Sequence, residues 1–182
     1  GSEIRRIREV AESGRFVEGS GRVEAGDIVR PYLDFMKENL RPGPVPRRVV
    51  LDCGNGVAGV AAPETYRTMG VEVETLFCEP DGRFPHHHPD PTVEENLEAL
   101  AGAVRERGAD LGIGFDGDAD RIGAVDDRGG VVRADELMIL FARDLLERAP
   151  GTGIIADVKS SQVLFDDIER HGGVPVMWKA GH

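Results

Sequence analysis

The sequence is poor in aromatic residues and cysteine, and it has no long apolar run. Aromatic residues make up 5% of the 182 residues, which argues against a surface that stacks nucleic-acid bases. The two cysteines, Cys53 and Cys78, are too few for a disulfide scaffold and are predicted to be small core or strand-end residues. No apolar run approaches the roughly 20 residues that span a bilayer, and no signal-peptide pattern opens the chain. We therefore expect a cytoplasmic protein without a membrane partner.

Basic side chains are also in deficit. The chain has 22 Lys and Arg against 33 Asp and Glu, a formal net charge of -11. A general nucleic-acid binder needs a basic face to neutralise phosphates, so nucleic acid is not an expected partner. A small anionic substrate remains compatible with this charge, because one local site can be positive on an acidic protein. Hydrophobic residues, at 40%, suffice for a core of one domain or of one domain plus part of a second.

The first 40 residues are predicted to hold two helices. Apolar residues at helical spacing predict a helix over residues 3–12, which glycines end from Gly14 onward. Asp27 is the predicted cap of a second helix, whose first turn tolerates Pro31. The following residues 41–46, Arg-Pro-Gly-Pro-Val-Pro, form a stiff connector.

Short apolar runs then alternate with helical patterns. Strands are predicted at residues 49–53, 71–77 and 111–115, and a hairpin at residues 122–132. One intervening helix starts shortly before Pro63 and ends at Gly70; the other follows a capping box of Thr92 and Glu95 and ends at Gly108. The order strand–helix–strand–helix–strand predicts a layered α/β domain with a mainly parallel, mixed sheet.

A second unit begins near Val131. A helix is expected over residues 135–148, then a strand, a helix and a strand over residues 153–158, 161–170 and 174–178. The expected apolar side of the first of these helices carries Leu137, Leu140, Phe141 and Leu145. A β-α-β unit buries its faces only against neighbours, so this is predicted to be a truncated second α/β unit of the same kind.

Three carboxylates occupy alternate positions directly after the strand at residues 111–115. They are Asp116, Asp118 and Asp120, separated by the small Gly117 and Ala119. Such oxygens suit a hard divalent cation, and the carboxyl end of a parallel strand is where these sheets bind ligands. Without a cation the three charges repel, with Arg121 the nearest compensation. The loop is therefore predicted to bind Mg²⁺.

The acidic loop has other possible interpretations. A solvated acidic turn is the simplest. An EF-hand is rejected, because its sixth position should be glycine and is Arg121, and its twelfth should be glutamate and is Asp127. A haloacid-dehalogenase-type phosphotransferase, with Asp116 as nucleophile and Asp118 in its next slot, stays open as the second reading. A zinc site at His86–His88 is not favoured, because consecutive histidines point in different directions.

Several segments together resemble the α-D-phosphohexomutases, the phosphomannomutase/phosphoglucomutase family. The loop Gly114-Phe115-Asp116-Gly117-Asp118-Ala119-Asp120-Arg121 resembles their metal-binding loop. Other resembling segments, in the family's order and spacing, are Leu51–Gly56, Asp81–Pro91, Asp157–Ser161 and Trp178–His182. Two departures are His86, where asparagine is common, and Ala180, where threonine is usual.

The resemblance implies a phosphoryl transfer through a phosphoserine and a bisphosphorylated sugar. It implies that Asp116, Asp118 and Asp120 ligate Mg²⁺. It implies that Arg121 contacts phosphate or phosphoserine, that Lys159 faces the sugar phosphate, and that His182 contacts substrate or transfers a proton. Taken alone, Lys159 is more simply interpreted as an exposed strand-end lysine. The implied partners are a mannose or glucose phosphate and the remaining domains of the parent chain, in a monomer.

The family's phosphoserine loop and C-terminal phosphate-clamp domain have no counterpart in these 182 residues. The sequence is therefore interpreted as an inactive piece of a mutase. Its expected parts are an interdomain helix and linker at residues 1–28, the family's metal-binding domain 2 at residues 29–130, and the start of domain 3 at residues 131–182. A stand-alone metal- or ligand-binding module is the alternative from another functional class.

Overall fold

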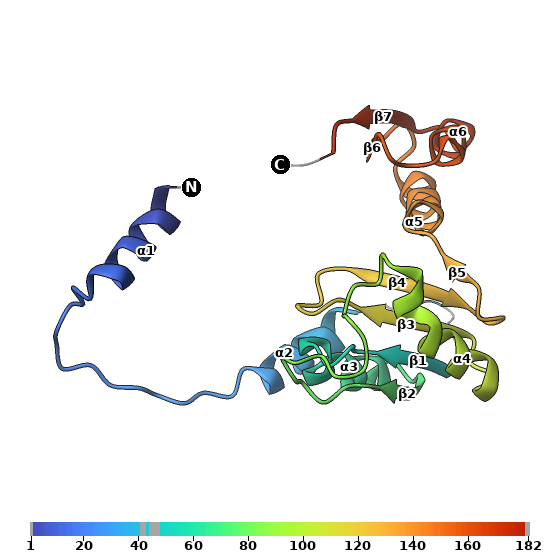
Figure 1. The fold of residues 1–182 in the computed structure, drawn as a ribbon. Helices are drawn as coiled ribbons and strands as arrows, with labels where there is room; N and C mark the ends of the chain where they lie inside the picture. The colour runs from blue at the N-terminus through green and yellow to red at the C-terminus, as the bar shows by residue number, and fades with distance from the viewer. Residues whose placement is uncertain (1, 41–42, 44–47, 181–182) are drawn as a thin grey trace.

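The computed structural model describes residues 2–40, 43 and 48–180, so most of the predicted connector lies outside the described part. Two helices come first, α1 (Ser2–Ser13) and α2 (Val29–Asn39). Asp27 caps α2, because its Oδ1 accepts the backbone N–H groups of Val29 at 3.0 Å and Arg30 at 3.2 Å. Figure 1 shows α1 apart from the sheet, at the end of an extended segment. None of the helices in the described residues is long and apolar enough to cross a bilayer.

A five-stranded sheet forms the centre of the first unit, in the order β2-β1-β3-β4-β5. Its strands are β1 (Arg48–Asp52), β2 (Glu72–Leu76), β3 (Leu111–Phe115), β4 (Ile122–Asp126) and β5 (Val131–Val132). Strand β1 runs parallel to β2 and β3, whereas β4 is antiparallel to both β3 and β5. The predicted mixed, mainly parallel sheet is confirmed. The carboxyl ends of β1, β2 and β3 therefore meet at one edge.

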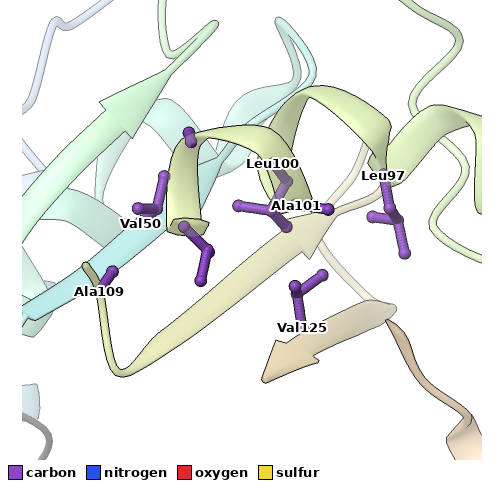
Figure 2. Close-up of a cluster of buried hydrophobic side chains, with 8 residues drawn as sticks. Val50, Leu97, Leu100, Ala101, Ala109 and Val125 are labelled. Atoms are coloured by element: carbon purple, nitrogen blue, oxygen red, sulfur yellow. The ribbon is translucent and has the colours of Figure 1, made fainter. Parts of the chain in front are cut away.

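Helices cover both faces of this sheet. They are α3 (Ala62–Thr68) and α4 (Glu98–Arg107), preceded by the 3-10 turns η1 (Val57–Val60) and η2 (Glu94–Leu97). Alternate residues of β1 point to opposite faces. Val50 packs with Leu100 and other residues of α4 (Figure 2), whereas Leu51 packs in a second cluster with Tyr66 of α3. The result is a helix–sheet–helix arrangement with one buried core on each side of the sheet.

Two glycines let α4 and the turn η2 before it lie close to β3. A Cβ on Gly112 would stand 2.8 Å from Cγ2 of Val104, and one on Gly114 would stand 2.7 Å from Cδ2 of Leu97. Both distances are shorter than real carbon contacts, so a side chain at either position would displace Val104 or Leu97. The close packing fixes β3, whose carboxyl end carries the aspartate loop.

The predicted capping box of Thr92 and Glu95 is wrong. Oγ1 of Thr92 donates to Oδ1 of Asp90 at 2.8 Å, and the Thr92 backbone N–H donates to the same oxygen at 3.1 Å. The residue before η2 is Val93, which provides no side-chain cap. The Asp90 carboxylate, a stronger acceptor two residues upstream, takes the Thr92 donors and forms a local aspartate turn instead.

The second unit consists of α5 (Ala134–Arg148), β6 (Gly153–Asp157), α6 (Gln162–Arg170) and β7 (Val174–Trp178). Strands β6 and β7 are parallel. Residues from α5, β6 and α6 form one buried cluster: Ala142, Leu146, Ile154, Ala156, Leu164, Phe165 and Ile168. A second, smaller α/β unit follows the first, as the sequence predicted.

The expected apolar side of α5 is mostly exposed in the described residues. Leu140 is 57% exposed and Phe141 is 62% exposed, whereas Ala142 and Leu146 are buried. Helix α5 has apolar residues on more than one side, so its periodicity alone does not determine which side is covered. In the described residues α6 and β6 cover the side that carries Ala142 and Leu146.

Candidate metal and phosphate site

The aspartate loop, residues 116–121, joins β3 to the antiparallel β4. The loop closes on itself, because the Asp116 N–H donates to the Arg121 carbonyl at 3.2 Å and the Ala119 N–H donates to the Asp116 carbonyl at 3.1 Å. Phe115 and Ile122 pair at its base in the sheet register. Two paired strands thus hold both ends of the loop, at the edge where parallel strands present their ligands.

The three carboxylates converge. One oxygen from each of Asp116, Asp118 and Asp120 lies within 4.8 Å of the other two, close enough to ligate one ion. Asp116 is 2% exposed, whereas Asp118 and Asp120 are exposed at the mouth of the loop. The convergence gives an all-oxygen donor set with one buried and two exposed ligands, which fits a hard divalent cation.

The pKa shifts reflect this crowding. The pKa of Asp120 is raised, first because its carboxyl shares a hydrogen bond with Asp116 and then because of the negative charge of Asp118. Burial acts to raise the pKa of Asp116, but the backbone and side-chain hydrogen bonds from Arg121 outweigh burial and lower it. In the absence of a cation, a proton on Asp120 relieves the repulsion between the carboxylates. A divalent cation would replace that proton.

Ala119 adopts a left-handed backbone conformation, with φ of 62°. This region favours glycine, and an L residue there is strained by roughly 1 kcal/mol or more. The turn at Ala119 reverses the chain between Asp118 and Asp120, which allows both carboxylates to reach the same side. The strain therefore accompanies the convergence of the ligands.

Arg121 ties the loop together while remaining accessible. Its Nε donates to Oδ2 of Asp116 at 2.9 Å, and its backbone N–H donates to Oδ1 of Asp116 at 3.0 Å. Its Nη1 lies 3.6 Å from Oδ1 of Asp90. Its side chain is 54% exposed, so the guanidinium can also meet an anion from solvent. Arg121 thus orients the buried Asp116 carboxylate, and the exposed part of its guanidinium has the chemistry to pair with an anion.

Lys159 lies apart from these residues, on the second unit. Its backbone N–H donates to Oδ1 of Asp157 at 2.7 Å, just after β6. Its side chain is exposed and lines a cleft of about 580 Å³. The far wall of this cleft includes Ile122 and Gly123, which directly follow Arg121. Of the predicted site residues, the structure brings together the three aspartates and Arg121, and Lys159 faces the adjacent cleft. His182 lies outside the described residues.

The histidines at positions 86–88 belong to a loop that packs over the carboxyl end of β1. Nδ1 of His86 lies 2.7 Å from Oδ1 of Asn55, and Nε2 of His87 lies 3.0 Å from Oδ2 of Asp52. In the described residues these histidines are not part of the acidic group able to hold an ion. Gly54 and Asn55 both have positive φ, 50° and 58°, and form a tight turn that receives this loop.

Sequence reasoning missed the contact of Asp90 with Arg121 and the pairing of Asp52 with His87. The partners are 31 and 35 residues apart along the chain, so no spacing rule links them. The one available signal was a carboxylate, Asp52, closing an apolar strand. A buried charge at a strand end requires a partner.

The fold and the site define an α/β/α domain with a loop of three converging carboxylates at the carboxyl edge of its sheet, followed by a second, smaller α/β unit. Residues 30–130 match the phosphoglucomutase/phosphomannomutase α/β/α domain II family, and residues 133–182 match domain III of the same family. The chain therefore belongs to the phosphoglucomutase/phosphomannomutase family, the α-D-phosphohexomutases, as the sequence motifs indicated.

Proteins with sequences or structures similar to this chain are named as members of the same family. A phosphomannomutase/phosphoglucomutase of Pseudomonas aeruginosa is 46% identical over 180 residues, covering 99% of this chain and 39% of that protein. A phosphoglucomutase of Neisseria gonorrhoeae is 41% identical, covering 100% of this chain and 40% of that protein. A crystal structure of a phosphoglucomutase/phosphomannomutase family protein from Burkholderia thailandensis superposes with a TM-score of 0.85 and 38% identity, covering 100% of this chain and 40% of that one. The chain thus spans about two fifths of these relatives.

Proposed function

We propose that the protein containing this chain interconverts hexose 1-phosphates and hexose 6-phosphates. The observation that carries the proposal is the convergence of Asp116, Asp118 and Asp120 beside Arg121, within a chain of this family. In this reaction a phosphoserine passes its phosphoryl group to the sugar, giving a bisphosphorylated sugar. The other phosphate then returns to the serine. The relatives named phosphomannomutase/phosphoglucomutase support mannose and glucose phosphates as the substrate class.

The aspartate loop would hold Mg²⁺ through Asp116, Asp118 and Asp120. When bound, the ion supplies positive charge that neutralises the transferring phosphoryl group. Arg121 binds the phosphate through the exposed part of its guanidinium, while its Nε keeps Asp116 in place. Lys159, exposed in the adjacent cleft, binds the sugar phosphate and is placed to exchange a proton with a sugar hydroxyl. His182 is proposed to contact the same substrate or to transfer a proton to it.

The chain is proposed to divide as an interdomain helix and linker at residues 1–28, domain 2 at residues 29–130, and the beginning of domain 3 at residues 131–182. The 182 residues alone carry no phosphoserine loop and are proposed to be inactive. The parent protein is proposed to be monomeric, which light scattering of the protein at its natural length checks. Turnover of glucose 1-phosphate or mannose 1-phosphate by the 182-residue chain would contradict the inactivity proposal.

The mutase proposal is tested on the protein at its natural length, with glucose 1-phosphate and Mg²⁺. Asp118→Asn removes one ligand and is expected to lower kcat by about 100-fold, on the scale of other lost charge-stabilising contacts. Asp127→Asn is the matched control, since this exposed aspartate outside the loop loses the same charge. Equal activities for the two variants, or an absence of mutase activity in the unsubstituted protein, would overturn the proposal.

The haloacid-dehalogenase reading is not favoured. Asp116 is 2% exposed, and both of its carboxylate oxygens accept hydrogen bonds from Arg121. A nucleophile must instead present a free oxygen to phosphorus. Mass spectrometry of protein quenched during turnover separates the two reactions. Phosphate on a serine supports the mutase, and phosphate on Asp116 supports the alternative.

A further inference from the structure

A second buried carboxylate lies near the site but outside the aspartate loop. Asp52, at the end of β1, is 1% exposed. Nε2 of His87 lies 3.0 Å from its Oδ2 and 3.2 Å from its Oδ1. The Gly54 backbone N–H donates to Oδ1 at 2.8 Å. The His87 side chain is itself only 16% exposed, so the two groups form a pair that is largely closed to water.

The geometry around His87 requires a proton between these partners. Nδ1 of His87 lies 3.0 Å from the carbonyl oxygen of His88, which can only accept, so Nδ1 carries a hydrogen. Nε2 faces two carboxylate oxygens, which also accept when ionised. Without a proton, an imidazole lone pair would face a buried carboxylate. Asp52 also accepts the Gly54 N–H, so one proton shared between Nε2 of His87 and the Asp52 carboxyl group completes the pair.

The surroundings of Asp52 are consistent with a retained proton. The pKa of Asp52 is raised, chiefly because burial disfavours its charge, while the Gly54 hydrogen bond and the positive charge of His87 act in the opposite direction. The other titratable groups facing Asp52 are His86, Cys53 and Cys78. His86 is already engaged: Asn55 donates to the Glu79 carbonyl through Nδ2, so its Oδ1 accepts from Nδ1 of His86.

The residues after His87 touch the aspartate loop. A Cβ on Gly117 would stand 3.4 Å from Cγ of Pro89, which shows that Pro89 lies against the loop backbone. On its other side, Gly117 accepts a hydrogen bond from the Val57 N–H at 3.1 Å. Asp90 is 3.6 Å from the Arg121 guanidinium. The loop segment that carries His87 therefore also carries the two residues that meet the aspartate loop.

We propose that Asp52 and His87 are a positioning pair, joined by one shared proton, that fixes Pro89 and Asp90 against the aspartate loop. The pair contacts none of the proposed metal ligands through its own side chains among the interactions of the described residues. It acts through the histidine loop. The proposal rests on the proposed function of the aspartate loop, but the state of the proton can be measured independently of metal and activity.

The proton is tested by nitrogen NMR of histidine-labelled protein at its natural length, at pH 7.5 and without metal. Nε2 of His87 is expected to be hydrogen-bonded to Asp52, and the ring nitrogen signals of His87 should change when Asp52 is replaced. Because burial raises the pKa of Asp52, the folded state keeps a proton that the unfolded chain has released, and stability should fall as pH rises through the folded-state pKa of Asp52. His87 nitrogen signals that do not respond to the replacement of Asp52 would overturn the proposal.

The positioning role is tested with three variants. Asp52→Asn keeps the geometry without the extra proton, because the amide nitrogen can donate to a neutral His87 and the amide oxygen can accept from Gly54. His87→Ala removes the pair. His88→Ala is the matched control, since it deletes a neighbouring imidazole but keeps the carbonyl that His87 uses. The readouts are Mn²⁺ affinity, kcat and KM separately, and the pH profile of stability.

His87→Ala is expected to weaken Mn²⁺ binding about tenfold, a size typical of residues that orient metal ligands. Asp52→Asn should stay within about twofold of the unsubstituted protein and lose its pH dependence of stability. Equal Mn²⁺ affinity in His87→Ala and His88→Ala, with metal binding intact, would overturn the inference. If His87→Ala does not fold, the Asp52→Asn protein decides. A pH dependence of stability equal to that of the unsubstituted protein would then overturn the inference. If the unsubstituted protein binds no Mn²⁺, the proposed function fails while the NMR result still decides the proton.

Discussion

At the scale of single residues, the three proposed ligands are not equivalent. Asp116 is buried and accepts two hydrogen bonds from Arg121, so its position is set before any ion arrives. Asp118 and Asp120 are exposed. A cation would order them, and the cost of their mutual repulsion is present only when the ion is absent. At these two positions the negative charges that favour metal binding therefore lower the stability of the metal-free protein.

Asp120→Asn is expected to expose that opposition. The raised pKa of Asp120, caused by Asp116 first and then by Asp118, shows that its charge is unfavourable in the metal-free loop. The variant should therefore unfold at a higher temperature than the unsubstituted protein in the presence of a chelator. It should bind Mn²⁺ more weakly and gain less from added Mn²⁺. Calorimetric unfolding with chelator and with Mn²⁺ measures both effects. An Asp120→Asn protein that is less stable in chelator than Asp127→Asn would contradict the expectation.

Ala119→Gly is expected to stabilise the protein by about 1 kcal/mol. Ala119 has φ of 62°, where glycine avoids the clash of a Cβ. The larger entropy of glycine in the unfolded chain offsets part of this gain. Urea unfolding measures the change. The matched control is Ala99→Gly in α4, an exposed helical site where glycine should destabilise by roughly 0.5–1 kcal/mol. Equal losses at both positions would show that the loop is not strained at Ala119.

At the scale of elements, helices α5 and α6 are joined by an ion pair beside their apolar contact. Nη2 and Nε of Arg143 donate to the two oxygens of Asp167 at 2.6 and 2.9 Å. The Asp167 side chain is 4% exposed, and the Arg143 side chain is 45% exposed. The hydrogen bonds from Arg143 lower the pKa of Asp167, and burial acts against them. Removing the arginine leaves a buried carboxylate with Arg170 and the imidazole of His171 as its remaining ion-pair neighbours.

Arg143→Met is expected to cost about 2 kcal/mol at pH 7, between the values for exposed and buried pairs. A depressed carboxyl pKa stabilises the fold above the unfolded-state value of 3.8, and this stabilisation is lost as pH falls through the lower folded-state value. The difference between variant and unsubstituted protein should therefore shrink toward zero in strong acid. Urea unfolding at pH 7 and in strong acid measures this difference in stability. Arg148→Met, which removes an exposed pair with Asp144, is the control and should change stability by less than about 0.5 kcal/mol.

At the scale of the whole molecule, the second unit is covered on one side. Ile154 and Ala156 of β6 are buried against α5 and α6, whereas Ile155 between them is 65% exposed. Because strand residues alternate between faces, Ile155 marks the opposite face of the β6–β7 sheet. The exposed Phe141 and Trp178 add further apolar surface on this unit. Apolar area of this kind normally contacts another part of the protein or a partner.

Ile155→Ala is expected to change the 182-residue chain little but to cost about 2–4 kcal/mol in the protein at its natural length. The first effect follows from the exposure of Ile155, and the second from burial of its side chain by the further residues that the longer relatives possess. Ile154→Ala is the matched control and should destabilise both forms, because Ile154 is 7% exposed in the chain described here. Chemical unfolding of both forms measures the costs. A small effect of Ile155→Ala in the longer form would mean that this face stays open.

The sequence predicted what depends on near neighbours. Strand-sized apolar runs, the glycine that ends α4 and the alternate aspartates each act within a few residues, so the element order and the acidic loop could be inferred. The errors also have local causes. Thr92 and Glu95 fit a capping box, but Asp90 competed successfully for the Thr92 donors. Helix α5 has apolar residues on two sides, and its periodicity does not indicate which side is buried.

The sequence by itself determined the family, the α/β order and the three carboxylates at one strand end, because these are properties of short segments and their spacing. Only the tertiary structure decided which partners the charged groups meet. The pairing of Asp52 with His87, and of Asp90 with Arg121, depends on how a long loop folds back over the ends of parallel strands. Electrostatic partners are selected by distance in space and by shared burial, and neither quantity is encoded in separation along the chain.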